Sequence, residues 1–166
     1  MRKEVLKKME KSLMLLQVFL AGVIAWLSDR LGILFPMLRV LCALMIADYF
    51  TGMAASKTEA IDHPGDPAYG WNSAKGAKGI LKKFGYLCVT AAGIVLDYVV
   101  MVATEHLGFE IRRSVFFGLL VTAWYILNEL LSITENAGRM GAPVPKWLVK
   151  YIAVLKSKID DKGSEE

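Results

Sequence analysis

Three carboxylates interrupt segments of the chain that are otherwise apolar enough for lipid: Asp48, Asp97 and Glu129. An ionised side chain near the centre of a bilayer costs at least about 2.5 kcal/mol on insertion scales, so each must face protein or water. Carboxylates in such places relay protons or ions, or join helices by hydrogen bonds. Which of these applies depends on the elements that carry them.

Other chemistry is sparse in the sequence. The chain has two histidines, and we find no nucleophile motif and no CxxC pair. Asp62, His63 and Asp66 occur at loop spacing in a segment broken by Pro64 and Pro67, which is a poor metal signature, so we expect a solvated loop there. Cys42 and Cys88 lie in apolar runs and are predicted to be small buried hydrophobes. We therefore expect no cofactor, no metal site and no enzyme activity.

The composition favours an integral membrane protein. Of the 166 residues, 55% are hydrophobic, which is high for a soluble domain of this size. Lysine and arginine gather near the N-terminus, between residues 57 and 83, and in the C-terminal tail, leaving the middle of the chain nearly bare. A nucleic-acid binder would instead place its basic residues on one folded face, so we expect no nucleic-acid partner. The isoelectric point near 9.0 favours binding to anionic lipid.

Four apolar runs, at 12–28, 33–55, 84–104 and 115–133, approach the roughly 20 residues needed to cross a bilayer. The first run has a basic leader, but no A-x-A cleavage site follows it, which favours a retained span over a signal peptide. We predict an all-α integral membrane protein with about four transmembrane helices and a C-terminal amphipathic helix. The corresponding regions are a basic cytoplasmic N-terminus at 1–11, a transmembrane domain at 12–135, and an amphipathic helix with a polar tail at 136–166.

The distribution of lysine and arginine also predicts orientation. With four spans, the N-terminus, the 57–83 region and the tail fall on one side of the membrane. We therefore predict both termini in the cytoplasm, with the turn at 29–32 and the loop at 105–113 outside. A three-span version, with the short first run at the interface, is the alternative.

Polar or small residues recur along one face of three runs. The second run carries Ala43, Ala47, Thr51 and Ala55, with Asp48 and Gly52 beside them; the third carries Tyr86, Thr90, Gly93, Asp97 and Thr104; the fourth carries Gly118, Thr122, Tyr125, Glu129, Ser132 and Asn136. Small residues let helix backbones approach closely in membranes. The stripes either join the helices, or line a water path or an interface between copies.

Basic residues flank the third run and occupy the tail. Asn72 or Ser73 can cap a helix start, after which Lys75, Lys78, Lys82 and Lys83 are expected at the headgroups. Asn136, Gly138 and Gly141 weaken the fourth helix, and the prolines after them end it. The segment that follows carries Lys146 and Lys150 opposite an apolar face, which fits either a membrane surface or another subunit.

Several motifs, in this order and spacing, resemble the phage lysis and toxin-secretion holin family, which includes the holin-like protein of clostridial toxin loci. They are "DYFTG" from Asp48, "NSAKGAKGILKKFGYL" from Asn72, the Leu96–Asp97 pair, and "WYILNELLSITENAGRMGAPVPKWL" from Trp124. The resemblance covers roughly residues 40–155. The loop "SKTEAIDHPGDPAYGWNS" is longer than the family pattern leads us to expect.

The resemblance implies a small protein of the bacterial cytoplasmic (inner) membrane that forms homo-oligomers and opens lesions. An endolysin or a toxin would be the passing cargo, and the anionic lipid membrane the other partner. Two alternatives remain from the residues themselves. One is a small ion or proton channel or transporter that uses Asp48, Asp97 and Glu129 as relays. The other is a membrane anchor that recruits a partner protein.

Overall fold

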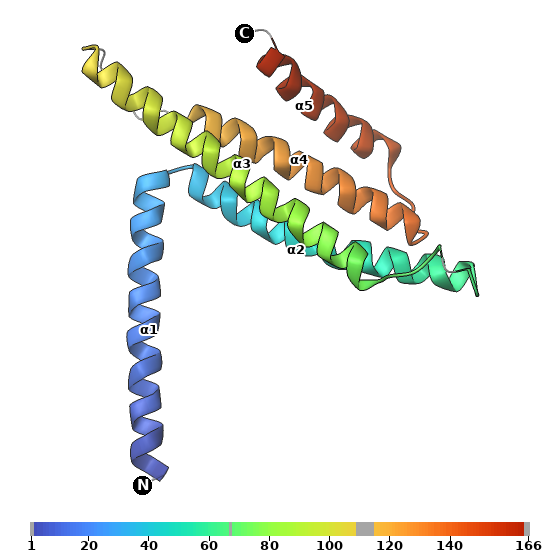
Figure 1. Ribbon diagram of the computed structural model, residues 1–166, viewed down its shortest axis with the longest axis horizontal. Coiled ribbons are helices and arrows are strands. Elements are labelled where there is room, and N and C mark those ends of the chain that lie inside the picture. Colours follow the sequence, from blue (N-terminus) through green and yellow to red (C-terminus); the bar gives the residue numbers. More distant parts are fainter. Residues whose placement is uncertain (1, 67, 109–114, 165–166) are drawn as a thin grey trace. The chain divides into compact units, whose positions relative to one another are not determined.

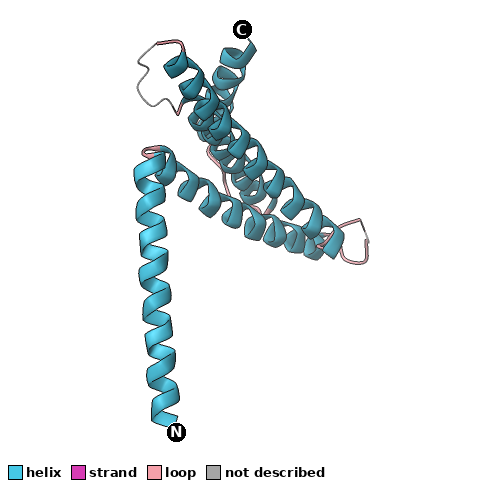
Figure 2. Ribbon diagram, turned by 60° about the vertical axis from the view of Figure 1, so that its left-hand side comes forward, coloured by secondary structure: helices cyan, strands magenta, loops and turns pink. Residues whose placement is uncertain are grey.

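The computed structural model describes residues 2–66, 68–108 and 115–164, and this part of the chain is helical without a strand (Figures 1 and 2). The helices are α1 (Arg2–Leu31), α2 (Leu34–Asp62), α3 (Ser73–His106), α4 (Phe116–Arg139) and α5 (Lys146–Ser164). In these described ranges, 4 helices are long and apolar enough to cross a membrane, namely α1 to α4. The predicted fold class, an all-α membrane protein with a further C-terminal helix, is confirmed.

The chain divides into two compact units, Met1–Pro36 and Met37–Glu166. In the first unit, α1 has 30 residues, about 45 Å at 1.5 Å per residue, which exceeds the roughly 30 Å of bilayer hydrocarbon. The basic leader and the first apolar run therefore form one helix. Gly32 follows it with a φ of 52°, a left-handed conformation that favours glycine, and its carbonyl accepts from the Phe35 N–H at 3.2 Å.

In the second unit, α3 and α4 approach each other closely because glycines meet at the crossing. A Cβ added to Gly93 would lie 3.2 Å from the Phe117 carbonyl oxygen and 3.3 Å from the Gly118 Cα. Beside this crossing, the rings of Tyr86 and Tyr125 stack with centroids 4.1 Å apart. Leu41 and Met45 of α2 complete a small apolar core with these tyrosines.

The buried faces of α3 and α4 follow the polar stripes of the sequence. They consist of Gly76, Tyr86, Thr90, Gly93 and Asp97 on α3, and of Gly118, Thr122, Tyr125, Glu129 and Asn136 on α4. The packed face of α2 agrees in part with the expected one. Ala55 of the expected stripe is buried, as are Leu41 and Met45, whereas Ala43 is exposed, because the packed face runs through Leu41, Met45, Asp48, Gly52 and Ala55.

Large apolar side chains cover the outside of the helices, as expected for contact with lipid. Phe50, Val95 and Tyr98 are 58%, 59% and 62% exposed. The prediction that both cysteines are buried is wrong, because Cys42 and Cys88 are exposed on this apolar exterior. A lipid-facing cysteine satisfies the same sequence pattern as a buried one, since both surroundings are apolar.

Candidate functional site

A buried group of polar side chains joins three helices of the second unit, and we call Asp48, Lys83, Glu129 and Asn136 the polar cluster. The Lys83 ammonium donates to Asp48 Oδ2 at 2.8 Å and also to the Glu129 carboxylate. Asn136 Nδ2 donates to Asp48 Oδ1 at 3.0 Å. Side-chain exposure falls from 16% at Asp48 and 12% at Lys83 to 2% at Glu129, so the cluster is sealed toward α4.

Helical spacing explains why these residues meet. Asp48 follows the buried Met45 by three residues on α2, and Glu129 and Asn136 lie two turns apart on one face of α4. Lys83 extends from α3 into the space between them. Sequence reasoning placed Lys83 with the headgroup lysines, but the structure places its ammonium inside, between two carboxylates.

The charges of the cluster do not balance when all its groups are ionised. Two carboxylates and one ammonium leave one negative charge. Asn136 offsets part of it by donating to Asp48, and its amide also donates to Thr51 Oγ1 at 3.2 Å. Buried charges are retained where partners and hydrogen bonds offset their desolvation, and this arrangement supplies both.

An ion pair extends the cluster toward the ends of α2 and α4. Arg139 donates to both carboxylate oxygens of Glu59, at 2.8 and 2.7 Å, and to Asn136 Oδ1 at 2.9 Å. Sequence reasoning missed this pair. In the sequence, the pair is indicated only by the position of Arg139, which follows Asn136 by one helical turn on the same face of α4.

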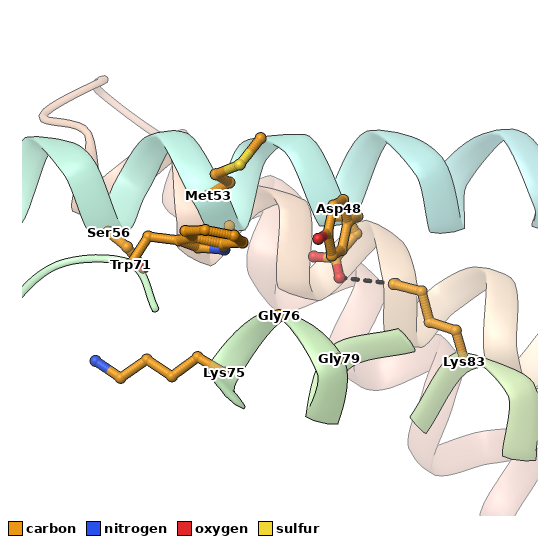
Figure 3. Close-up of a pocket in the computed structure, with 10 residues that line it drawn as sticks. Asp48, Met53, Ser56, Trp71, Lys75, Gly76, Gly79 and Lys83 are labelled. Atoms are coloured by element: carbon orange, nitrogen blue, oxygen red, sulfur yellow. Dashed lines mark hydrogen bonds and ion pairs between the residues drawn. The ribbon is translucent and has the colours of Figure 1, made fainter. Parts of the chain in front are cut away.

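A cavity of about 190 Å³ lies beside the cluster, toward the loop between α2 and α3 (Figure 3). It is lined by Asp48, Tyr49, Gly52, Met53, Ser56, Trp71, Lys75, Gly76, Gly79 and Lys83. The Trp71 ring packs on Gly76, where an added Cβ would lie 3.0 Å from the indole. A cavity of this size has room for several waters, so it suits solvent around the cluster and not a large solute.

The sequence model of the bacteriophage holin family matches residues 22–157 of this chain. The chain belongs to this family. An uncharacterized protein of Halalkalibacterium halodurans is 37% identical over 138 residues, which cover 82% of this chain and 88% of that protein. Uncharacterized proteins of Listeria innocua and Clostridium perfringens are 32% and 31% identical, over 75% and 50% of this chain and 75% and 55% of their own length. No solved structure matches.

The family resemblance predicted from the motifs is thus confirmed, and this holin-family protein is a multi-pass membrane protein. All members of the polar cluster lie within the matched residues. The relatives are named as uncharacterized proteins, so their similarity supports the family assignment and gives no information about the mechanism.

Asp97 has a structural partner in this holin-family protein. Its carboxylate accepts from the backbone N–H groups of Phe117 and Gly118, at 2.9 and 2.7 Å. These groups begin α4, where free N–H groups and the helix dipole favour an anion. Asp97 therefore caps α4 from α3 and lies apart from Asp48 and Glu129.

The remaining predicted residues take different positions. Thr122 is buried and donates to the Gly118 carbonyl at 2.6 Å, and Ser132 is half-buried. Lys78, Lys146 and Lys150 are exposed, as are Lys82, which lies over the Tyr86 ring, and Lys75, which donates to the carbonyls of Ala68 and Gly70. Asn72 caps α3 by accepting from the Lys75 N–H at 2.8 Å.

The predicted loop residues also have local contacts. The His63 ring stacks on Tyr69 with centroids 4.0 Å apart, and Asp66 accepts from the Ala68 N–H at 2.9 Å. Within the described residues, no group of three or more potential ligands could hold a metal ion.

Proposed function

We propose that this protein is a holin, which accumulates in the bacterial cytoplasmic membrane, oligomerises and opens lesions. A cell-wall hydrolase or a toxin would then leave the cytoplasm through the lesion. Membership of the bacteriophage holin family is the observation that carries this proposal. The cargo passes and is not chemically changed, so the proposal gives no residue a catalytic role.

The packing of the helices supports a lesion built from several copies. The polar cluster joins α2, α3 and α4, and the cavity beside it, between α2 and α3, has a volume of about 190 Å³. That volume is far below what a folded hydrolase needs. Passage of a protein would therefore have to occur between subunits, with the polar cluster holding each subunit together.

The distribution of charge supports an orientation with both termini in the cytoplasm before the lesion opens. The α2–α3 loop and the α4–α5 turn lie at the same end of the second unit (Figure 1). Lys75, Lys78, Lys146 and Lys150 all lie near this end. Anionic lipid would attract each of them by roughly 1 kcal/mol.

Inducible expression in a bacterium, followed with a membrane-impermeant dye, tests the proposal. A holin gives no dye entry for a period and then abrupt entry in each cell. Steady flux that depends on one solute would instead indicate a transporter. Undisturbed cells with the protein inserted would indicate an anchor, and either result would overturn the proposal.

A further inference from the structure

A cavity and a groove adjoin each other between α2 and α3. The cavity beside the polar cluster has a volume of about 190 Å³, and the groove has a volume of about 410 Å³. Tyr49 and Lys83 line both of them, so the two spaces meet at these side chains. The cavity contains charged groups, whereas the rest of the groove lining is apolar. Together they have the two parts that a site for an amphiphile needs.

The groove lies on the apolar exterior of the second unit. It is lined by exposed apolar side chains of both helices, including Cys42, Ile46 and Phe50 of α2 and Ile80 of α3. Ile46, Phe50 and Ile80 are 60%, 58% and 56% exposed. In a bilayer, side chains with this exposure contact lipid, so an acyl chain is the natural occupant of the groove.

The cavity lies nearer the headgroups than the groove does. On α3 its lining falls within residues 75–83, which directly precede the apolar run at 84–104. Lysines at such a position mark the membrane interface. On α2 the cavity is lined from residue 48 to residue 56 and the groove from residue 42 to residue 50. The order is that of a phospholipid, with a polar end at the interface and an apolar end toward the hydrocarbon.

The interior of the cavity favours a cation. The polar cluster carries one surplus negative charge when all its groups are ionised, and Asp48, whose side chain is 16% exposed, is its carboxylate in the cavity lining. Two aromatic residues meet at Gly76, where an added Cβ would lie 3.0 Å from the Trp71 ring and 3.3 Å from the Tyr49 hydroxyl oxygen. A carboxylate beside aromatic rings attracts an ammonium group.

The two lysines of the lining are compatible with a cation that has an anion next to it. The Lys83 ammonium has three N–H groups. Among the described residues, Asp48 and Glu129 accept two of them, so one is left for an acceptor where the cavity meets the groove. Lys75 points away from Asp48 (Figure 3) and donates to two carbonyls of the preceding loop, at 3.3 and 3.1 Å.

We propose that the cavity and the groove form a binding site for a phospholipid with a primary-amine headgroup. The ammonium lies in the cavity and donates to Asp48, the phosphate accepts from Lys83, and one acyl chain lies in the groove. Only the amine end of the lipid enters the cavity, where it neutralises the surplus charge of the polar cluster. The inference requires a membrane protein and not a lesion, so it is independent of the proposed holin function.

Native mass spectrometry of the detergent-solubilised full-length protein tests this site. The protein is titrated with phosphatidylethanolamine, phosphatidylcholine or phosphatidylglycerol of identical acyl chains, and the fraction with one bound lipid is measured. Phosphatidylethanolamine should bind at least about tenfold more tightly than phosphatidylcholine, because methylation removes the N–H donors for Asp48 and a hydrogen bond to a charged group contributes at least that factor. Equal binding of these two lipids, or tighter binding of phosphatidylglycerol, would overturn the inference.

A substitution within the cavity separates this site from general lipid binding. A Cβ added to Gly79 meets no atom of the described residues within 4 Å, so the side chain of Gly79→Leu has room to occupy the cavity and should abolish the preference for phosphatidylethanolamine. Gly85→Leu is the matched control, since Gly85 is equally open on the same helix and lines neither space, and this variant should keep the preference. A preference that survives in Gly79→Leu would contradict the proposed site.

A soluble headgroup distinguishes a lipid from a small amine. Glycerophosphoethanolamine carries the same ammonium and phosphate without acyl chains, so it should displace bound phosphatidylethanolamine only weakly. Displacement at the same concentration as by the lipid itself would mean that the groove holds no acyl chain, and it would overturn the lipid assignment.

Discussion

Replacing Lys83 with methionine tests whether the polar cluster holds the second unit together. The change keeps most of the length of the side chain and removes the ammonium that bridges Asp48 and Glu129. Both carboxylates would then remain inside without their cation. Removing one partner of a buried ion pair costs about 3–5 kcal/mol. Because the Lys83 side chain is 12% exposed, we expect the lower end of that range.

A loss of about 3 kcal/mol lowers the equilibrium constant for folding roughly 100-fold. The measurement is unfolding of the detergent-solubilised protein by titration with sodium dodecyl sulfate, followed by helix content. Lys82→Met is the matched control, since Lys82 adjoins Lys83 and lies on the outside of the same helix. Its ammonium is 5.6 Å from the centre of the Tyr86 ring, a contact that contributes about 0.5–1 kcal/mol at an exposed site.

A second substitution isolates the cause. Glu129→Gln retains an acceptor for Lys83 and removes the surplus negative charge, so alone it should change the free energy of unfolding by less than about 1 kcal/mol. Combined with Lys83→Met, it should restore at least about 1 kcal/mol, a coupling expected of residues in direct contact. If Lys83→Met unfolds like Lys82→Met, within about 0.5 kcal/mol, then Lys83 extends to the headgroups and the cluster does not exist in the membrane.

Four further substitutions, one of them with a matched control, probe the packing of α2, α3 and α4. Gly93→Ala should lower the stability of the second unit, because the new Cβ would lie 3.2 Å from a backbone oxygen; Gly85→Ala on the same helix meets nothing within 4 Å and should be neutral or stabilising in the same titration. Thr90→Val should be neutral or stabilising, because the buried Thr90 hydroxyl has no hydrogen-bond partner among the described residues; a clear loss of stability would indicate a partner. Asp48→Asn should leave insertion and crosslinked oligomers intact and shift only the onset of dye entry, since one interhelical hydrogen bond contributes about 0.6 kcal/mol. Gly52→Leu should reduce stability more than Asp48→Asn does, because its side chain would displace the Asn136 amide, 3.5 Å from the added Cβ; equal stability would mean that α2 lies farther from α4.

The buried faces of α3 and α4 were predictable from sequence because each carries an unbroken series of small or polar residues. At helical spacing, such a series marks one face, and in lipid that face is the one that needs protein neighbours. On α2 the same reasoning was right for Ala55, which is buried, and wrong for Ala43, which is exposed. The small residues step by four and drift across the packed face, and Ala43 and Leu41 differ too little in character for a pattern to choose between them.

The role of Lys83 was not predictable because Lys82 and Lys83 are identical in type and adjacent in sequence. A helix turns by about 100° between neighbours, so one of them faces outward while the other faces the bundle. The choice depends on where Asp48 and Glu129 lie, 35 residues before and 46 after Lys83. For α5, the amphipathic pattern was correctly recognised, but it does not distinguish a membrane surface from α4 of the same chain.

The polar contacts of α4 divide between two sides of the helix, and this division bears on how a lesion could open. Glu129 and Asn136 face α2 and α3, while Trp124 contacts α5. Asn128 lies between the two sides, donating to Tyr86 of α3 and accepting from Lys156 of α5. Apolar contacts discriminate weakly between a neighbouring helix and a lipid chain, so polar contacts at depth decide which helices stay together. On the first side, hydrogen bonds and ion pairs of the polar cluster join α2, α3 and α4, and separating these helices would break them. The second side depends on α5, which is tethered by residues 140–145 and carries lysines that favour water. The α4–α5 contact is therefore the one whose free energy changes most when water replaces lipid around the protein.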